Sequence, residues 1–537
     1  MRDLSILNDI LGPVIRGPSS SHTGGSFFIG RLARHLLGEE PVRARIVFDT
    51  QGSYGRVYRQ QKCDLGFAAG LLGWEITDSR FSDALNFASR SGLKIVFELA
   101  SLPEADHPNF TLLELEGSSG QKIKLKARSV GGGLVEIIEL QGWPVLIRGD
   151  RYDYLFLIPG KEKEALKNFL SSFLIQAEKI DFQEKGEEVL AHIISCIPLN
   201  SALIETIKNK FSLKGFWSSQ PLRLVASGNP LFRSATEALI LVEKEKKSLG
   251  ELAIAYESQI LGLTESEIKK ELGQRLEIMK QAVASGLKKD LPLQLLRPAA
   301  HFILQAEKEG KLACGGPLTR AAARAMAAQH TAASMGVVCA APTAGSAGTL
   351  PGVMVTLLED RGVSEAKAIE ALAAAGAVGL IVGYRATFAA EIAGCQVEIG
   401  AAGAMGAAAV VEAAGGLARQ ALDAAAISFQ NSMGSVCDLV QGICEIPCHT
   451  RNALAAASSF ICADLILGGY ENPIPFDETI DAVYEVGKML PQELKVTSLG
   501  GLALCPSAQR LKRNSSSKGR GLKSNRKAYR GKEKREA

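Results

Sequence analysis

Residues 371–384 read Ala-Leu-Ala-Ala-Ala-Gly-Ala-Val-Gly-Leu-Ile-Val-Gly-Tyr, a run without a charged side chain. The run is shorter than the roughly 20 apolar residues that cross a bilayer, so it predicts a buried core helix. It belongs to a stretch from 315 to 465 that is rich in Ala and Gly. Small side chains let helix axes pack closely, and helices that are apolar on every side are usually buried in a bundle. The C-terminal half is therefore predicted to be helical.

The part of the chain before this helical half has a different pattern. A short helix, a Gly-Pro-Ser-Ser-Ser-His-Thr turn and several β-type runs predict a mixed α+β domain near the N-terminus. The next segment has the order βαββαβ of a ferredoxin-like module, which can be a structural spacer or an ACT-type ligand sensor. The predicted fold class is multidomain α+β, with an α+β domain at 1–148, an ACT-like module at 149–222, an all-α catalytic domain at 230–507 and a disordered basic tail at 508–537.

The distribution of charge and the number of cysteines limit the binding partners, the cellular location and the role of the cysteines that can be expected. Residues 508–537 hold 12 Lys and Arg and 2 acidic residues, which leaves 49 basic and 55 acidic residues elsewhere. The basic tail can be a solvated extension or an arm for nucleic acid, and its lack of a fold signature favours the first. Acidic residues near Met1 argue against an export signal, so a cytoplasmic protein is expected. Ten cysteines in such a chain are metal ligands or buried thiols rather than a disulfide framework.

Three cysteines lie at breaks in the helical half, beside Gly or Pro. Their surroundings are Ala393-Gly-Cys-Gln-Val-Glu398, Gly434-Ser-Val-Cys-Asp438 and Glu445-Ile-Pro-Cys-His449. Iron–sulfur clusters are held by Cys sulfur, and Cys395, Cys437 and Cys448 could hold three irons of a [4Fe–4S] cluster. The alternative is three buried small hydrophobes, which free cysteines often are.

Two loops have the composition of anion sites. Residues 341–348 contain Thr343 and Ser346 and lead into a helix, whose N-terminus presents free N–H groups. Ser19, Ser20, Ser21, His22 and Thr23 place four hydroxyls and an imidazole ahead of another helix. Such groups can cap a helix and can also bind a carboxylate.

Together these segments resemble the iron–sulfur-dependent L-serine dehydratases (L-serine ammonia-lyases), in the form that fuses the β and α chains. The resemblance covers roughly residues 1–510. It is carried by Gly17-Pro-Ser-Ser-Ser-His-Thr23, Ala341-Pro-Thr-Ala-Gly-Ser-Ala-Gly348, Gly394-Cys-Gln396, Val436-Cys-Asp438, Pro447-Cys448, Arg451-Asn452 and Thr497-Ser-Leu-Gly-Gly-Leu-Ala503.

The resemblance implies a carbon–nitrogen lyase that converts L-serine to pyruvate and ammonia without pyridoxal phosphate. Cys395, Cys437 and Cys448 would hold a [4Fe–4S] cluster, and the loops at 19–23 and 343–346 would bind the substrate. The expected partners are L-serine and a second copy of the chain, with neither membrane nor nucleic acid.

Several positions depart from the family pattern. Gln61-Lys-Cys-Asp64 replaces His-Gly-Thr-Asp, so the family histidine is Gln61 here. Ala332 stands in place of an asparagine, and residues 386–394 replace a Ser-Gly-Ala-Glu-Gly pattern. Changed hydrogen-bonding groups change which substrate a pocket accepts. A paralogue acting on another small amino or hydroxy acid, or a non-catalytic amino-acid sensor, are therefore alternatives to an L-serine dehydratase.

Overall fold

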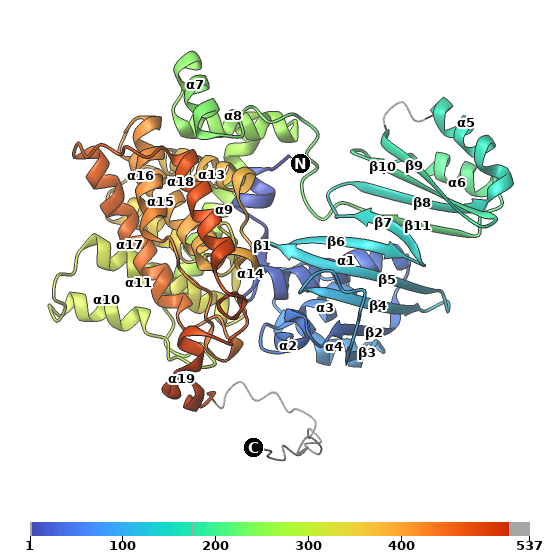
Figure 1. The fold of residues 1–537 in the computed structure, drawn as a ribbon, viewed down its shortest axis with the longest axis horizontal. Helices are drawn as coiled ribbons and strands as arrows, with labels where there is room; N and C mark the ends of the chain where they lie inside the picture. Colours follow the sequence, from blue (N-terminus) through green and yellow to red (C-terminus); the bar gives the residue numbers. More distant parts are fainter. Residues whose placement is uncertain (1–2, 174–176, 515–537) are drawn as a thin grey trace, which may run out of the picture.

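The computed structural model describes residues 3–173 and 177–514. It is a mixed α+β protein with an N-terminal sheet domain and a helical C-terminal region, as predicted. In Figure 1 the helical domain lies on the left, the six-stranded sheet domain at the lower right and a smaller sheet module at the upper right. Most of the predicted basic tail, residues 515–537, lies outside the described residues.

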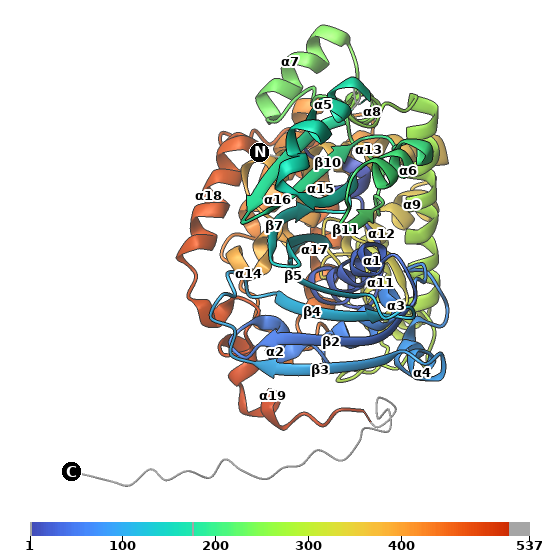
Figure 2. The same cartoon turned by 90° about the vertical axis from the view of Figure 1, so that its right-hand side faces the viewer.

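The N-terminal domain is built on a sheet with the strand order β3-β2-β4-β5-β6-β7. Only the β2–β3 pair is parallel, and Figure 2 shows β2, β3 and β4 side by side. Apolar side chains of the sheet share one core with the first helices. The elements are α1 (Gly25–Leu37), β2 (Pro41–Asp49), α2 (Ser53–Val57), α3 (Cys63–Leu71), α4 (Ala84–Arg90), β3 (Lys94–Ala100), β4 (Phe110–Gly117), β5 (Lys122–Gly131), β6 (Leu134–Leu140) and β7 (Trp143–Ile147).

The second module has the predicted βαββαβ order. Its strands form an antiparallel sheet in the order β11-β8-β10-β9. Phe156 and Ile158 on one face pack with Leu166 and Leu170 of its first helix. Its first helix begins at Lys163 and is described to Phe173, and residue 174 lies outside the described residues. The elements are β8 (Tyr152–Pro159), α5 (Lys163–Phe173), β9 (Ala177–Lys185), β10 (Glu188–Ser195), α6 (Ser201–Lys210) and β11 (Gly215–Ser219).

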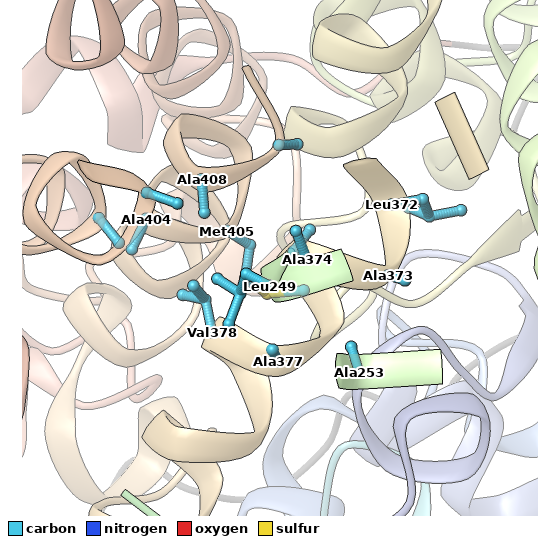
Figure 3. Packing of buried hydrophobic residues seen from close by; sticks show 14 of the residues in the cluster. Leu249, Ala253, Leu372, Ala373, Ala374, Ala377, Val378, Ala404, Met405 and Ala408 are labelled. Carbon is cyan, nitrogen blue, oxygen red and sulfur yellow. The ribbon is translucent and has the colours of Figure 1, made fainter. Parts of the chain in front are cut away.

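The C-terminal domain is a bundle of helices around α13 and α15. The run at 371–384 lies in α13, which is long and apolar enough to cross a membrane, yet 72% of its most apolar window is buried within the protein. Figure 3 shows Ala374 and Val378 of α13 near Met405 of α15 in this core. The main helices are α7 (Ala235–Glu245), α8 (Leu249–Leu261), α9 (Glu265–Gly286), α10 (Ala300–Lys308), α11 (Pro317–Ala333), α12 (Thr349–Glu359), α13 (Glu365–Arg385), α15 (Ile399–Ala413), α16 (Ala418–Asn431), α17 (Cys448–Leu467) and α18 (Phe476–Met489).

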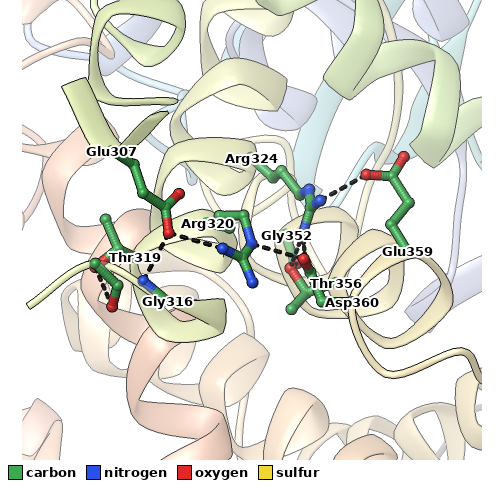
Figure 4. Close-up of polar contacts among 10 residues, drawn as sticks. Glu307, Gly316, Thr319, Arg320, Arg324, Gly352, Thr356, Glu359 and Asp360 are labelled. Carbon is green, nitrogen blue, oxygen red and sulfur yellow. Dashed lines mark hydrogen bonds and ion pairs between the residues drawn. The ribbon is translucent and has the colours of Figure 1, made fainter. Parts of the chain in front are cut away.

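A charged network fixes α12 against α10 and α11 (Figure 4). Arg320 bridges Glu307 at 2.7 Å and Asp360 at 2.6 Å. The largely buried Arg324 donates to Thr356 Oγ1 at 2.8 Å and also pairs with Asp360. Because α12 begins directly after the 341–348 loop, this network helps to hold that loop in place.

The N-terminal boundary of the sheet domain differs from the sequence-based expectation. The helical turn η1 (Ile6–Ile10) is buried in the core of the C-terminal domain rather than with residues 25–148. A Cβ on Gly379 of α13 would lie only 2.1 Å from Ile10 Cγ2, so a glycine is needed for this approach. Buried Glu257 accepts hydrogen bonds from Ile6 N at 2.7 Å and Leu7 N at 3.0 Å. The first residues therefore belong structurally to the helical domain.

A two-stranded sheet continues this connection. β1 (Val14–Arg16) pairs antiparallel with β12 (Val337–Cys339) of the helical domain. Arg16 Nη1 also donates to Met335 O at 2.9 Å. The segment between β1 and α1 therefore lies against the helical domain.

The C-terminal boundary also differs. The predicted disordered tail begins at 508, but Pro506–Arg510 form the short helix α19. Asn514 donates from its backbone N to Gln294 O at 2.8 Å. Order therefore extends at least to Asn514, because these backbone and side-chain groups find partners on the helical domain.

Glu257 gives the N-terminal connection a pH dependence. Burial raises the pKa of this carboxyl from 4.5 to about 7 in the folded protein. A raised folded pKa stabilises the protein below the unfolded pKa, and this contribution is lost as the pH rises through 7. Between pH 5 and 8 the free energy of unfolding should fall by roughly 2–3 kcal/mol more in the wild type than in Glu257→Gln.

The measurement is urea unfolding at both pH values. Glu243→Gln, at an exposed position of α7, is the control and should keep the wild-type pH dependence. Equal pH dependence in the wild type and Glu257→Gln would contradict the assignment.

Candidate functional site

One cavity is lined by both large domains and contains most of the predicted site residues. It lies where the segment after β1 meets the cysteine-bearing segments of the helical domain. Its lining is Pro18, Ser19, Ser20, Ser21, His22, Gln61, Gly345, Ala390, Glu391, Cys395, Glu398, Ile399, Cys437, Leu439, Cys444, Cys448 and Val496. The tertiary structure thus joins the hydroxyl loop to the three predicted metal ligands.

The hydroxyl loop is held in a fixed conformation by its own side chains. Ser19 caps the helical turn η2 (Ser20–Gly24) by accepting from His22 N at 3.1 Å. The His22 ring lies between Ser19 Oγ at 3.0 Å from Nδ1 and Ser53 Oγ at 2.9 Å from Nε2. Burial lowers the pKa of His22 to about 4, so the imidazole is neutral at pH 7.

The two predicted anion loops touch each other. Ala344 N donates to Ser20 Oγ at 3.4 Å. Thr343 Oγ1 and Ser346 Oγ lie 3.1 Å apart, and Ser346 Oγ donates to Ala341 O at 3.1 Å. Thr343 and Ser346 therefore shape the loop, while Gly345 between them lines the cavity.

Gln61 also lines the cavity, and Thr23 holds the Gln61 backbone in place by a hydrogen bond. Thr23 Oγ1 donates to Gln61 O at 2.6 Å. Gln61 Nε2 donates to Gly442 O at 2.6 Å, whereas its buried Oε1 has no hydrogen-bond partner. A buried acceptor without a partner costs free energy, so Oε1 is a candidate contact for a ligand in the cavity. Ala332 of α11, another altered position, lies instead in the apolar core of the sheet domain and does not line the cavity.

The three predicted ligands are buried and come from separate elements. Cys395 starts the turn η5 (Cys395–Val397), Cys437 lies in a loop, and Cys448 starts α17. Their exposed fractions are 1%, 3% and 2%. The ligand atoms of Cys395, Glu398 and Cys437 all lie within 4.8 Å of one another. Cys448 Sγ lies 3.6 Å from the thiol of Cys444.

Hydrogen bonds to neighbouring residues hold the Cys395 and Cys437 segments together. Gln396 N donates to Ser435 O at 3.2 Å, and Gly434 N donates to Gln396 Oε1 at 2.8 Å. Gly394 has φ +75°, and a Cβ there would lie 2.7 Å from Ser435 O. A side chain at 394 would therefore force these two segments apart.

Arg451 and Asn452 tie the third cysteine to the others. Arg451 donates to Val436 O at 2.7 Å and to Asp438 Oδ1 at 3.0 Å, which fixes α17 against the Cys437 loop. Asn452 Oδ1 accepts from Gly348 N at 3.2 Å and Thr349 N at 3.1 Å. Its Nδ2 donates to Gly345 O at 2.8 Å and Cys448 O at 2.9 Å. Asn452 is thus a positioning residue that joins Cys448 to the 341–348 loop.

Two acidic residues of the cavity were not predicted from the sequence. Burial raises the pKa of Glu391, and burial together with the Cys395 thiol raises the pKa of Glu398 well above its usual value. The position of Glu398 three residues after Cys395, within one turn, was the available signal. Glu391 and Val496 also line an adjoining cavity whose wall contains Ser53, Arg56, His107 and Lys495.

The donor set fits an iron–sulfur cluster. Three buried thiols converge on one cavity from glycine- or proline-flanked breaks, and thiolates are the ligands such clusters take. Of the other cysteines, Cys444 lines this cavity, whereas Cys63, Cys196, Cys314, Cys339, Cys462 and Cys505 do not.

The fold and site define a multidomain α+β protein in which the N-terminal sheet domain and the helical domain jointly enclose a thiol-lined cavity. Residues 239–503 match the family model of the serine dehydratase alpha chain. The chain is 38% identical to the probable L-serine dehydratase alpha chain of Bacillus subtilis over 285 residues, which cover 53% of this chain and 95% of that protein. It is 34% identical to the L-serine dehydratase alpha chain of Peptoniphilus asaccharolyticus over 286 residues, 53% of this chain and 98% of the relative.

The similarity extends to a second kind of chain, the L-serine dehydratase beta chain. The chain is 37% identical to the probable L-serine dehydratase beta chain of Bacillus subtilis over 185 residues, 34% of this chain and 82% of the relative. This chain belongs to the L-serine dehydratase family.

Replacing a single ligand should separate metal binding from folding. Cys395→Ser, Cys437→Ser and Cys448→Ser should each lose most of the iron taken up during anaerobic reconstitution, because hydroxyls are poor substitutes for thiolates. Cys462→Ser, at a buried thiol of α17 outside the cavity, should keep wild-type iron content and visible absorbance. Equal iron in all four variants would contradict the ligand assignment.

Asn452→Ala should destabilise the protein by about 2–4 kcal/mol, because it leaves buried backbone donors of residues 348 and 349 without partners. Chemical denaturation would measure this change. The control is Asn86→Ala at an exposed position of α4, which should stay within about 0.5 kcal/mol of the wild type. If Asn452→Ala lowers the free energy of unfolding no more than Asn86→Ala, the connection between Cys448 and the 341–348 loop does not depend on the Asn452 side chain.

Proposed function

We propose that this chain is an L-serine dehydratase that uses a [4Fe–4S] cluster held by Cys395, Cys437 and Cys448, without pyridoxal phosphate. The observation that carries the proposal is the single cavity in which those thiols meet the Ser19–His22 loop. Relatives of both domains carry the name L-serine dehydratase, which supports the same reaction. When bound, such a cluster supplies Lewis acidity toward the substrate hydroxyl.

The hydroxyl loop is suited to the substrate carboxylate. Ser20, Ser21 and His22 present hydroxyl and imidazole groups to the cavity at the start of η2. Gly345, positioned by Thr343, Ser346 and Asn452, forms the opposing wall. Preorganised donors of this kind orient a carboxylate without rearrangement, which lowers the entropic cost of reaction.

The acidic side of the cavity is suited to the substrate ammonium group. Glu391 and Glu398 are carboxyls in the same cavity, and Gln61 Oε1 is a buried acceptor. A cationic ammonium would compensate their burial, because an adjacent positive charge favours the ionised carboxylate. The carboxylate and ammonium contacts together would fix the Cα–H and Cβ–OH bonds for elimination. Loss of the Cα proton and of the Cβ hydroxide, which leave together as one water, gives 2-aminoacrylate, and its hydrolysis gives pyruvate and ammonia.

Gln61 favours a second candidate within the same chemistry. Where the family pattern noted in the sequence has a histidine, this cavity has an amide that cannot titrate near pH 7. The second candidate is therefore elimination from another small amino or hydroxy acid. The third alternative, an amino-acid sensor, depends on residues 149–222 acting as an ACT-type module. Their βαββαβ order supports that assignment.

The remaining expectations extend this proposal. We propose a cytoplasmic homodimer in which the sheet module at 149–222 serves regulation. The burial of 72% of the most apolar window of α13 within the bundle supports the expectation that no membrane is a partner.

The rate of pyruvate formation should depend on the residues that line the cavity. Anaerobically reconstituted protein should form pyruvate from L-serine, measured by coupling to lactate dehydrogenase. Gln61→Ala should raise KM by about 10-fold or more, because a hydrogen bond to a charged group contributes about 1.5–3 kcal/mol. Gln121→Ala at an exposed position should leave KM unchanged. Iron-loaded protein that turns over another hydroxy amino acid but not L-serine would favour the second candidate.

A further inference from the structure

A fourth thiol, that of Cys444, shares the cavity with the three expected ligands. Cys444 Sγ lies 3.6 Å from Cys448 Sγ and packs against the cluster of apolar side chains that contains Cys395, Cys437 and Cys448. Among the cysteines of the described residues, these four are the ones that line the cavity.

The backbone around Cys444 is fixed on both sides. Gly442, before it, accepts from Gln61 Nε2 at 2.6 Å. Glu445, after it, is 1% exposed, and its carboxylate accepts from three consecutive backbone N–H groups at 2.6–2.9 Å. Those donors are Gln294, Leu295 and Leu296. Because the chain is held two residues before Cys444 and at the residue directly after it, the Cys444 side chain has a defined position at the cavity wall.

We propose that Cys444 is a fourth thiolate ligand, one that in the resting protein binds the iron left without a ligand by Cys395, Cys437 and Cys448. The inference rests on the proposed cluster but adds a residue to it. Thiolate is the preferred ligand of iron–sulfur clusters, and this thiol lines the same cavity as the three other thiols. Cys444 would then protect the exposed iron and compete with the substrate hydroxyl.

Oxidation of the reconstituted protein tests this directly. In a four-iron cluster held by three cysteines, mild oxidation releases the one iron that has no cysteine ligand. A paramagnetic three-iron cluster remains. The wild type, treated with ferricyanide under anaerobic conditions, should retain about four irons per chain, whereas Cys444→Ala and Cys444→Ser should retain about three. Iron analysis and electron paramagnetic resonance give the readout, and Cys462→Ser should behave as the wild type.

The substrate gives a second measurement. If Cys444 occupies the iron nine-tenths of the time, the apparent affinity for L-serine is reduced about tenfold, so KM should fall by up to that factor in Cys444→Ala. If Cys444→Ala does not fold, KM is measured in Cys444→Ser instead. Circular dichroism and the unfolding midpoint show whether each variant is folded.

The outcomes separate the two proposals. Wild-type protein that holds four irons but converts to the three-iron form as readily as Cys444→Ala would overturn the role of Cys444 and leave the proposed function intact. Wild-type protein that takes up no iron would overturn the cluster itself, and with it the role of Cys444.

Discussion

The pairing of Val14–Arg16 with Val337–Cys339 is the constraint on which the site depends. Before this pairing, residues 6–10 are buried among the helices, where Glu257 satisfies their first backbone donors. After it, the chain turns through the Ser19–His22 loop into α1. The hydroxyl groups can reach the cysteines only because the N-terminus crosses into the helical domain first. Two domains thus share one cavity, and the core of the sheet domain also includes apolar residues of α9 and α11.

Inside the helical domain, the cysteines owe their positions to polar side chains rather than to one rigid helix. Arg451 and Asn452, consecutive on α17, point to different segments: one to the Cys437 loop, the other to the 341–349 loop. Gln396 performs the same task between Cys395 and Ser435. These bonds are buried or partly buried and would be costly to leave unmade, so the geometry of the thiols is preorganised.

Much of the fold followed from local pattern. The apolar, small-residue run at 371–384 predicted a buried helix, and α13 has that role because its glycines admit Ile6 and Ile10. The βαββαβ order at 149–222 was also predicted correctly. The domain ends were not, because residues 6–10 and 506–514 are ordered by partners distant in sequence, which periodicity does not report.

The sequence by itself determined the residue types of the site: thiols beside Gly or Pro, a hydroxyl-rich turn, and Gln61 in place of a histidine. Tertiary structure alone decided which of them share a cavity. It placed Glu391, Glu398 and Cys444 beside the predicted ligands, turned Thr343 and Ser346 into supports of their own loop, and buried Ala332 away from the site. The physical reason is that side-chain direction depends on packing and hydrogen bonds between segments hundreds of residues apart.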